Sequence, residues 1–248
     1  MQRFFVHLAY DGEPYCGWQM QPNGRSVQAC LQEALSILLR QDISVVGCGR
    51  TDAGVHASSY YAHFDWPGDP LPFERRGDWT YKLNALLDRA ITVYSVFEVP
   101  EGLHARYSAL QRRYRYYLHT HKDPFSDRFS YHCRFAFDPD RVRQAGVRLT
   151  ACRDFTSFAK LHSDNKDNLC RLVQADFEQT GLYTWRFTFT ANRFLRNMVR
   201  AMAGTMLGVG SGRYSMDDLE DIISAKDRCK AGVSMPAHAL FLDKITYF

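Results

Sequence analysis

Residues 26–64, SVQACLQEALSILLRQDISVVGCGRTDAGVHASSYYAHF, contain the alternation of elements that decides the fold. Ser26 is a suitable helix cap, and the apolar side chains after it recur at the spacing that lines one face of a helix. Residues 43–46 are typical of a short strand, residues 47–56 of a glycine-flanked loop, and residues 60–64 of another strand. This order predicts a helix that packs on a sheet.

The alternation continues on both sides of this stretch. Alternating side chains predict strands over residues 4–10 and 91–97, and Asp78 is placed to cap a helix over residues 79–87. The first hundred residues therefore follow the order strand, helix, strand, strand, helix, strand. That order is typical of an α+β domain whose helices lie on one face of its sheet.

The rest of the chain repeats this theme without visible sequence repetition. Helices are predicted to begin at Asp138-Pro139 and at Ser215, and a long helix is predicted over residues 193–207. The predicted strands cover residues 113–119, 169–178, 183–190 and 240–247. A boundary near Gly102 divides the chain into an N-terminal domain of residues 1–102, which carries the 47–56 loop, and a C-terminal domain of residues 103–248 that completes the active-site cleft.

Composition limits the class of protein. Of the 248 residues 46% are hydrophobic and 23% charged, which is ordinary for a globular protein, and a net charge of +4 permits a polyanionic partner. The cysteines number seven and form no CxxC pair, so reduced thiols are expected rather than disulfides or a zinc site. Residues 1–15 are too polar for a secretory signal, and no apolar run is long enough to cross a membrane. We therefore expect a cytoplasmic protein.

The loop GCGRTDAGVHA, residues 47–57, is the segment best suited to chemistry. Small residues surround one carboxylate, Asp52, and small residues let a bulky ligand approach the backbone closely. Arg50 is a near neighbour in the sequence, and a guanidinium favours the ionised carboxylate that a nucleophile or general base requires. By composition alone, a tight turn with a surface ion pair explains the same residues.

The whole string resembles the catalytic loop of the tRNA pseudouridine synthase A family. Other strings that resemble this family occur in the same order along the chain. They are YCGWQMQ (15–21), SVQ (26–28), HAR (104–106), RYRY (113–116), DFTSF (154–158), ANRFLRNMVRAMAG (191–204) and PAHALFL (236–242). A single short motif is weak, but several ordered motifs over roughly residues 10–242 make the resemblance specific.

The resemblance implies a role for each matching residue. Asp52 matches the family's essential aspartate, Tyr114 the tyrosine that lies against the target base, and Arg200 an arginine that pairs with the aspartate. Arg50 matches a residue implicated in displacing the target nucleotide. The other residues assigned to substrate binding are His56, Arg106, Arg113, Arg115 and Arg196.

The same resemblance implies the fold and the partners. It implies two RRM-like or ferredoxin-like α+β halves with largely antiparallel sheets and helices packed on one side, which together form a pseudouridine synthase core. The family needs no cofactor and no metal. It acts as a homodimer on uridines at positions 38, 39 and 40 in the anticodon stem-loop of tRNA.

The resemblance is imperfect at four positions outside the implied catalytic set, and at one of them Cys48 replaces another small residue. Tyr60 stands where the family often carries Gln, Asp88 where it usually carries Pro, and Ala239 where it usually carries Gly.

Basic residues point to an RNA surface. Residues 106–122 are dense in basic side chains and tyrosines, which contact phosphates and stack on bases. Strand alternation divides them between two faces, so about half of them are expected to face RNA. In the predicted helix over residues 193–207, the spacing of Arg193, Arg196 and Arg200 places all three on one face.

The chemistry of isomerisation agrees with a lone carboxylate. The bond from uracil N1 to ribose C1′ breaks and C5 bonds instead, with no redox change, so no cofactor is needed. Asp52 can attack C1′, attack C6 of the base, or take a proton from C2′, and sequence does not choose among these routes. A metal site formed by Cys48, His56 and His63 is disfavoured, since their spacing does not match a common zinc pattern.

Two other classes of function remain open from the residues alone. The first class is an RNA-binding α+β module without chemistry. The second class is a hydrolase that cleaves the nucleoside bond with a carboxylate. Asp52 disfavours the binding module, because a carboxylate in an RNA-facing loop repels phosphate unless chemistry needs it. A hydrolase releases free uracil, whereas an isomerase releases nothing.

Overall fold

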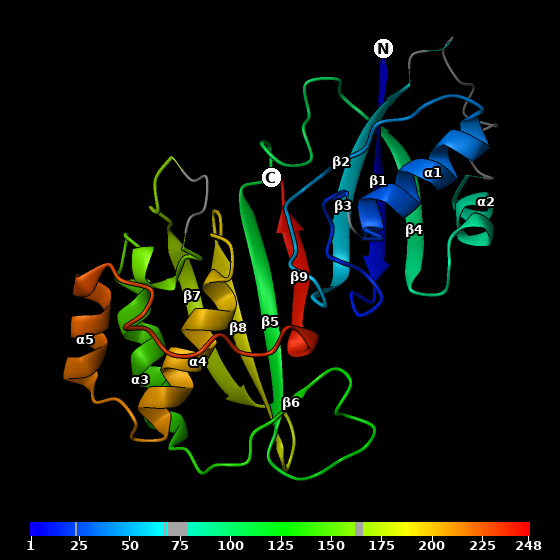
Figure 1. Cartoon of the computed structure of the whole chain (residues 1–248). Coiled ribbons are helices and arrows are strands. Elements are labelled where there is room, and N and C mark those ends of the chain that lie inside the picture. The colour runs from blue at the N-terminus through cyan, green and yellow to red at the C-terminus, as the bar shows by residue number, and fades with distance from the viewer. Residues whose placement is uncertain (23, 67, 69–78, 162–165) are drawn as a thin grey trace. The chain divides into compact units, whose positions relative to one another are not determined.

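The computed structural model describes residues 1–22, 24–66, 68, 79–161 and 166–248 (Figure 1). The chain forms two compact units: the first consists of Met1–Leu110 with Leu242–Phe248, and the second of Gln111–Phe241. Gly102, the predicted boundary, lies in the loop shortly before the change from one unit to the other. The C-terminal residues belong to the first unit.

The first unit is a sheet covered by two helices. Its elements are β1 (Gln2–Tyr10), α1 (Val27–Leu39), β2 (Val46–Gly47), β3 (His56–Trp66), α2 (Trp79–Leu86), β4 (Ile91–Val99) and most of β9 (Leu240–Thr246). The strand order is β4-β1-β3-β9, with β2 paired to β3, and β1 runs antiparallel to both β3 and β4. Helix α1 lies across the sheet with α2 beside it (Figure 1).

Local signals in the sequence explain these elements. The Ser26 hydroxyl accepts a hydrogen bond from the Ala29 N–H at 3.2 Å and begins α1 as predicted, while Leu31 and Leu35 bury its apolar face. Under the helices, the Phe4 ring stacks on Phe64 at 5.5 Å. The strands predicted at 4–10, 60–64 and 91–97 are confirmed and extend further. Asp78, the predicted cap of α2, lies outside the described residues.

The strand predicted over residues 43–46 is wrong for most of its length, because only Val46 and Gly47 pair with β3. Ile43 and Val45 are buried as a strand would bury them. Their backbone groups, however, bond to side chains of α1. The Ile43 N–H donates to Ser36 Oγ at 3.0 Å, and the Val45 N–H donates to Gln32 Oε1 at 3.0 Å. Helix side chains thus replace the neighbouring strand.

The second unit has the same layered design. Its elements are β5 (Gln111–His119), β6 (Tyr131–His132), α3 (Pro139–Thr150), β7 (Leu172–Gln179), β8 (Thr184–Ala191), α4 (Met198–Gly210) and α5 (Met216–Ala225), with 3-10 turns at Thr156–Phe158 and Ala237–Ala239. The strand order is β5-β8-β7, and β8 is antiparallel to both neighbours. The short β6 pairs in parallel with the end of β5. Helix α3 packs on β7 and α4, and α5 lies outside them (Figure 1).

Predicted caps in this unit are confirmed. Asp138 accepts hydrogen bonds from the first backbone N–H groups of α3, and Ser215 and Asp218 form a reciprocal capping box at α5. The predicted strand over residues 169–178 begins later, at Leu172, since Leu169 makes only an isolated bridge with Asp154. The predicted α+β class, with antiparallel pairing and helices on one side of each sheet, is confirmed in both units.

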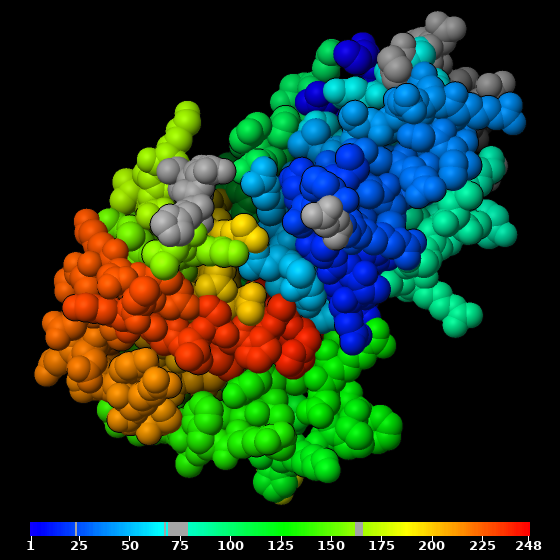
Figure 2. Space-filling view, viewed as in Figure 1, coloured from blue at the N-terminus to red at the C-terminus, as the bar shows by residue number. Residues whose placement is uncertain are grey.

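The long helix predicted over residues 193–207 begins at Met198 and ends at Gly210. Asn197 precedes it in the left-handed conformation, with φ of 67°, and this turn ends the irregular segment after β8. Residues 193–196 therefore lie before the helix. Residues 226–236 run over the surface of the second unit beside α4 (orange-red in Figures 1 and 2). Gly204 lets them approach, because a side chain there would collide with the Val233 carbonyl.

No helix within the described ranges is both long and apolar enough to pass through a lipid bilayer.

Candidate active site

Asp52 lies half-buried in the loop that joins β2 to β3 of the first unit. The Val55 N–H donates to the Asp52 carbonyl at 3.1 Å and closes a four-residue turn. Gly54, the third residue of this turn, has φ of +74°, a conformation that favours glycine. The carboxylate is thus attached to a tight, sequence-specified turn.

An aromatic clamp, formed by Trp18 and Tyr60, supports the loop from below. The Tyr60 ring stacks on Trp18 at 4.1 Å, and its hydroxyl donates to the Gly49 carbonyl at 2.5 Å. Both side chains are almost fully buried. Gly47 must be glycine, because a Cβ there would collide with Tyr60 and Trp18. Tyr60, which stands where the resembled family often carries Gln, therefore holds the Asp52 loop in this chain.

The YCGWQMQ segment reinforces the residue before Asp52. The Trp18 N–H donates to the Thr51 carbonyl at 3.3 Å, and Gly17, with φ of +102°, passes so close that a Cβ would lie 2.5 Å from that carbonyl. Tyr10 Oη and Thr51 Oγ1 share a hydrogen bond of 2.9 Å. Two motifs that are separate in sequence thus form one support for the carboxylate.

Arg50 and His56 flank Asp52 and differ in exposure. Arg50 is exposed, and its Nε donates to Gln19 Oε1 at 3.2 Å. His56 is only 1% exposed and lies beneath the loop, where its Nδ1 accepts from the Gly12 N–H at 3.0 Å and lies 3.0 Å from Asp11 Oδ1. His56 had been assigned to substrate binding from sequence. Its burial favours a role in holding the loop, because a ring without exposed surface does not meet RNA.

Arg106 is the fourth predicted site residue in the first unit. It is exposed, and its guanidinium lies over the Tyr107 ring at 5.7 Å from the ring centre. An exposed cation beside an exposed aromatic ring suits contact with phosphate and base.

Tyr114 lies on β5 of the second unit and is 8% exposed. Phe194 meets its ring edge-on, at 5.1 Å between centres and 88° between planes. Arg113 and Arg115 flank it on the strand and are half-buried, so the strand alternates between a face that is mostly buried and a face that is half-buried. The expected division of this strand into two faces is therefore confirmed.

Arg200 lies in the first turn of α4 and is fastened to residues 234–235. Its Nε donates to the Met235 carbonyl at 2.5 Å, and the Met235 N–H donates to the Arg200 carbonyl at 3.2 Å. Asn197 Nδ2 donates to Ser234 Oγ at 2.6 Å. The start of α4 is thus held by a segment more than thirty residues away in sequence.

Arg228 completes this network and was not predicted as a functional residue. It donates from one terminal nitrogen to Ser234 Oγ at 2.6 Å and from the other to the Gly232 carbonyl at 3.1 Å. Burial lowers the pKa of its guanidinium. No sequence motif indicates a functional role for Arg228, because its partners are backbone groups and a serine in an irregular segment.

The prediction that Arg193, Arg196 and Arg200 share a helix face is wrong. Only Arg200 is helical, since α4 begins at Met198 after the left-handed Asn197. Arg193 pairs with Asp167 at 3.3 Å, and exposed Arg196 accepts from the Lys160 N–H through its carbonyl. The three arginines therefore do not share a helix face.

The structure thus divides the predicted site residues between the units. Arg50, Asp52, His56 and Arg106 lie in the first unit, and Arg113, Tyr114, Arg115, Arg196 and Arg200 lie in the second. The pairing of Arg200 with Asp52 stays a prediction.

A family model and several known proteins are similar to this chain. A family model described as tRNA pseudouridine synthase matches residues 149–247. The tRNA pseudouridine synthase A of Bacteroides fragilis is 49% identical over 247 residues, which cover 100% of this chain and 97% of that protein. The enzyme of the same name from Bacillus subtilis is 39% identical over 246 residues, with 97% of each chain covered.

The family model and the relatives that match over the whole length together show a pseudouridine synthase, an isomerase that acts on tRNA. Identity of this extent over the whole length shows that the chain belongs to the tRNA pseudouridine synthase A family. The family resemblance predicted from the ordered motifs is confirmed.

Proposed function

We propose that the chain isomerises uridine to pseudouridine at positions 38, 39 and 40 of the tRNA anticodon stem-loop, with Asp52 as its catalytic carboxylate. The observation that carries the proposal is the support of the Asp52 loop. Glycines at 17, 47 and 54, the Tyr60–Trp18 stack and the Thr51 hydrogen bonds all hold the backbone of the loop that carries this half-buried carboxylate. Such preorganisation suits a group that must meet a reacting atom in one geometry.

Reaching the target base requires that it leave its stack, which costs a few kcal/mol. Exposed Arg50 precedes Asp52 in the same loop and is suited to fill the gap left in the stem. Its side chain is held by a hydrogen bond to Gln19. Tyr114, braced edge-on by Phe194, offers a flat ring against which the extruded base can lie. Arg200, anchored to Met235, is assigned to hold the Asp52 carboxylate in its ionised form.

The reaction conserves atoms and electrons. The N1–C1′ bond breaks, the base turns, C5 bonds to C1′, and the proton that leaves C5 is balanced by one gained at N1. Asp52 attacks C1′, attacks C6 or removes the C2′ proton. Each route uses one carboxylate and no external oxidant or reductant, so this proposal includes no cofactor.

Basic residues are assigned to the phosphates of tRNA. Exposed Arg106 and Arg196 and half-buried Arg113 and Arg115 present guanidinium groups. Binding should weaken as salt rises, because each phosphate contact releases counterions. We further propose that the chain acts as a homodimer, which the resemblance implied, and in the cytoplasm, which its composition led us to expect. Sedimentation at micromolar concentration should give a dimer.

The variant Asp52→Asn tests the assignment of Asp52 as the catalytic carboxylate. The variant keeps the shape of the side chain, so it should stay folded, bind tRNA and form no pseudouridine. Asp42→Asn, an exposed carboxylate in the same unit, serves as the control and should keep full activity. Mass spectrometric mapping of the tRNA gives the modified positions. Normal turnover by Asp52→Asn would remove the assignment, and release of free uracil would indicate a hydrolase instead.

A further inference from the structure

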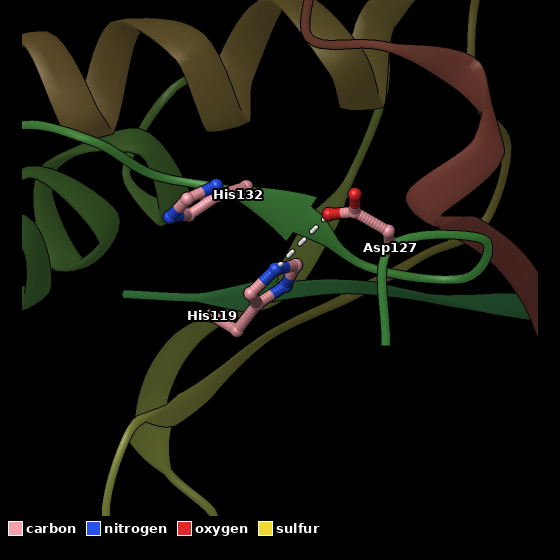
Figure 3. Close-up of side chains that lie close together, drawn as sticks. All are labelled: His119, Asp127 and His132. Carbon is pink, nitrogen blue, oxygen red and sulfur yellow. Dashed lines mark ion pairs between the residues drawn. The ribbon is translucent and has the colours of Figure 1, made fainter. Parts of the chain in front are cut away.

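Two histidines and an aspartate gather at the end of β5, outside the residues assigned to catalysis. His119 is the last residue of β5, His132 is its register partner on β6, and Asp127 lies in the connection between them (Figure 3). One ligand atom from each lies within 4.8 Å of the other two. Among the described residues, this is the group of histidine, cysteine and acidic side chains with the spacing to hold a metal ion.

His119 is buried and oriented like a metal ligand. Its side chain is almost fully buried, and its Nδ1 lies 3.0 Å from Ser130 Oγ. Within the described part of the chain its Nε2 makes no hydrogen bond, although it lies 3.3 Å from Asp127 Oδ1. When Nδ1–H donates to Ser130, the Nε2 lone pair faces a carboxylate oxygen. Two acceptors then face each other, an arrangement that a cation between them would stabilise.

The other two groups have room to move toward the cation. The His132 ring is half-exposed and lies parallel to the His119 ring, with centres 5.0 Å apart and 9° between planes. The Asp127 side chain is 62% exposed. Bond lengths of about 2.0–2.1 Å in a tetrahedral site bring ligand atoms to about 3.4 Å from one another. Since His119 Nε2 and Asp127 Oδ1 already lie 3.3 Å apart, movement of the His132 ring toward them closes the site.

The charge state of His119 agrees with this geometry. Burial, and then the neighbouring His132, lower the pKa of His119, while Asp127 raises it. The net lowering favours neutral imidazole at neutral pH, and neutral imidazole is the form that binds metals.

We propose that His119, Asp127 and His132 form a site for a divalent cation of the zinc type, with water as the fourth ligand. Two nitrogens and one carboxylate oxygen form a donor set that Zn²⁺ accepts. The cation fastens residues 120–130 to the end of β5. This role is structural, includes no step of the isomerisation, and does not depend on the function proposed above.

The sequence hid this group because its ligands follow the pattern H-x7-D-x4-H, which matches no common zinc motif. Pairing of β6 with β5 brings the two histidines together, and β6 is only two residues long. The histidines weighed for a metal from sequence, His56 and His63, lie elsewhere, in β3 of the first unit.

Calorimetric titration of the chelator-treated, full-length protein with ZnCl₂ tests the site. We expect one Zn²⁺ per chain with a Kd of about 10 µM or tighter. Asp127→Asn and His132→Gln should each weaken binding at least about tenfold. Both side chains are at least partly exposed, so these variants should fold, which circular dichroism verifies. His121→Ala, an exposed histidine of the same loop that stacks on Tyr183, is the matched control and should bind as the wild type does.

Cobalt gives a second readout. Co²⁺ in a four-coordinate site absorbs strongly in the visible range, and this band should vanish in His132→Gln and persist in His121→Ala. The proposal is overturned if no saturable zinc binding occurs below about 100 µM, or if both ligand variants bind zinc as the wild type does. In that case the Nε2–H of the neutral His119 ring simply donates a hydrogen bond to Asp127.

Discussion

The Asp52 loop and the start of α4 each position a charged residue assigned to catalysis, but they use different forces. In the loop, buried aromatic rings and glycines fix the backbone, and the partners of Gly49 and Thr51 are Tyr60, Tyr10 and Trp18. At α4, a polar network joins the helix start to the segment that carries Arg228 and Ser234. The first support relies on packing and shape. The second relies on hydrogen bonds that a distant, irregular segment provides.

This difference predicts how each region fails. Packing in a close-fitted interior tolerates no added atom, because surrounding side chains already occupy the space. A hydrogen-bond network tolerates shape changes but loses its geometry when one member is removed. Variants in the two regions should therefore differ in whether stability or turnover suffers more.

Gly47→Val should have the largest effect. Its side chain would collide with the Tyr60 hydroxyl and the Trp18 ring, so the clamp must separate. We expect a loss of about 3 kcal/mol in the free energy of unfolding, together with loss of activity. Gly49→Ala is the matched control, because a Cβ there meets nothing within 4 Å. Urea unfolding of both variants decides the point, and equal stability of the two would contradict the aromatic clamp.

His63, in strand β3 after the Asp52 loop, should make the free energy of unfolding depend on pH. His63, the register partner of Val46 in β2, has a pKa lowered to about 4, chiefly by burial and then by Arg3 and His104. Its Nδ1 accepts from the Ala105 N–H at 3.2 Å, which requires the neutral ring. An unfolded chain binds this proton near pH 6.5, so stability is complete above that pH and is lost as the pH falls toward 4.

Because of the lowered pKa of His63 alone, the free energy of unfolding should be about 2 kcal/mol lower at pH 5 than at pH 7.5. His63→Asn keeps an acceptor for Ala105 but does not titrate. Its unfolding free energy should be lower at pH 7.5 and should fall less steeply toward pH 5. Parallel pH profiles for the two proteins, measured by urea unfolding, would show that His63 does not carry this dependence.

Arg228→Met should break the polar network at α4. The side chain keeps most of its length but loses the bonds to Ser234 and Gly232, which should cost about 1–2 kcal/mol of unfolding free energy. Since Arg200 depends on the same segment, we expect kcat to fall about tenfold with little change in KM. Exposed Lys230→Met is the control. A lower stability with unchanged kcat would make Arg228 merely structural.

Tyr60→Phe should have the smallest effect. It removes only the hydrogen bond to the Gly49 carbonyl and leaves the stack on Trp18 in place. We expect a loss of about 1 kcal/mol in the free energy of unfolding. Tyr94→Phe, on an exposed ring of β4, is the control. Thermal unfolding separates the two, and a loss as large as that of Gly47→Val would show that the hydroxyl, rather than packing, dominates the clamp.

The sequence alone determined the features that depend on near neighbours. Helix caps at Ser26, Asp138 and Ser215, the periodicity of the long strands, and the ordered motifs that show the family all involve residues close in the chain. Local hydrogen bonds and side-chain spacing decide these features, so they are visible before folding.

Only the tertiary structure decided the features that depend on distant partners. Side chains of α1 replaced a strand at Ile43 and Val45, left-handed Asn197 began α4 five residues late, and His56 was buried beneath its loop. Each outcome depends on contacts outside the run of residues in which periodicity is read, from seven residues away at Ile43 to 44 residues away at His56. Periodicity reports which side chains are apolar, but it does not report which hydrogen-bond partner the fold will bring to them.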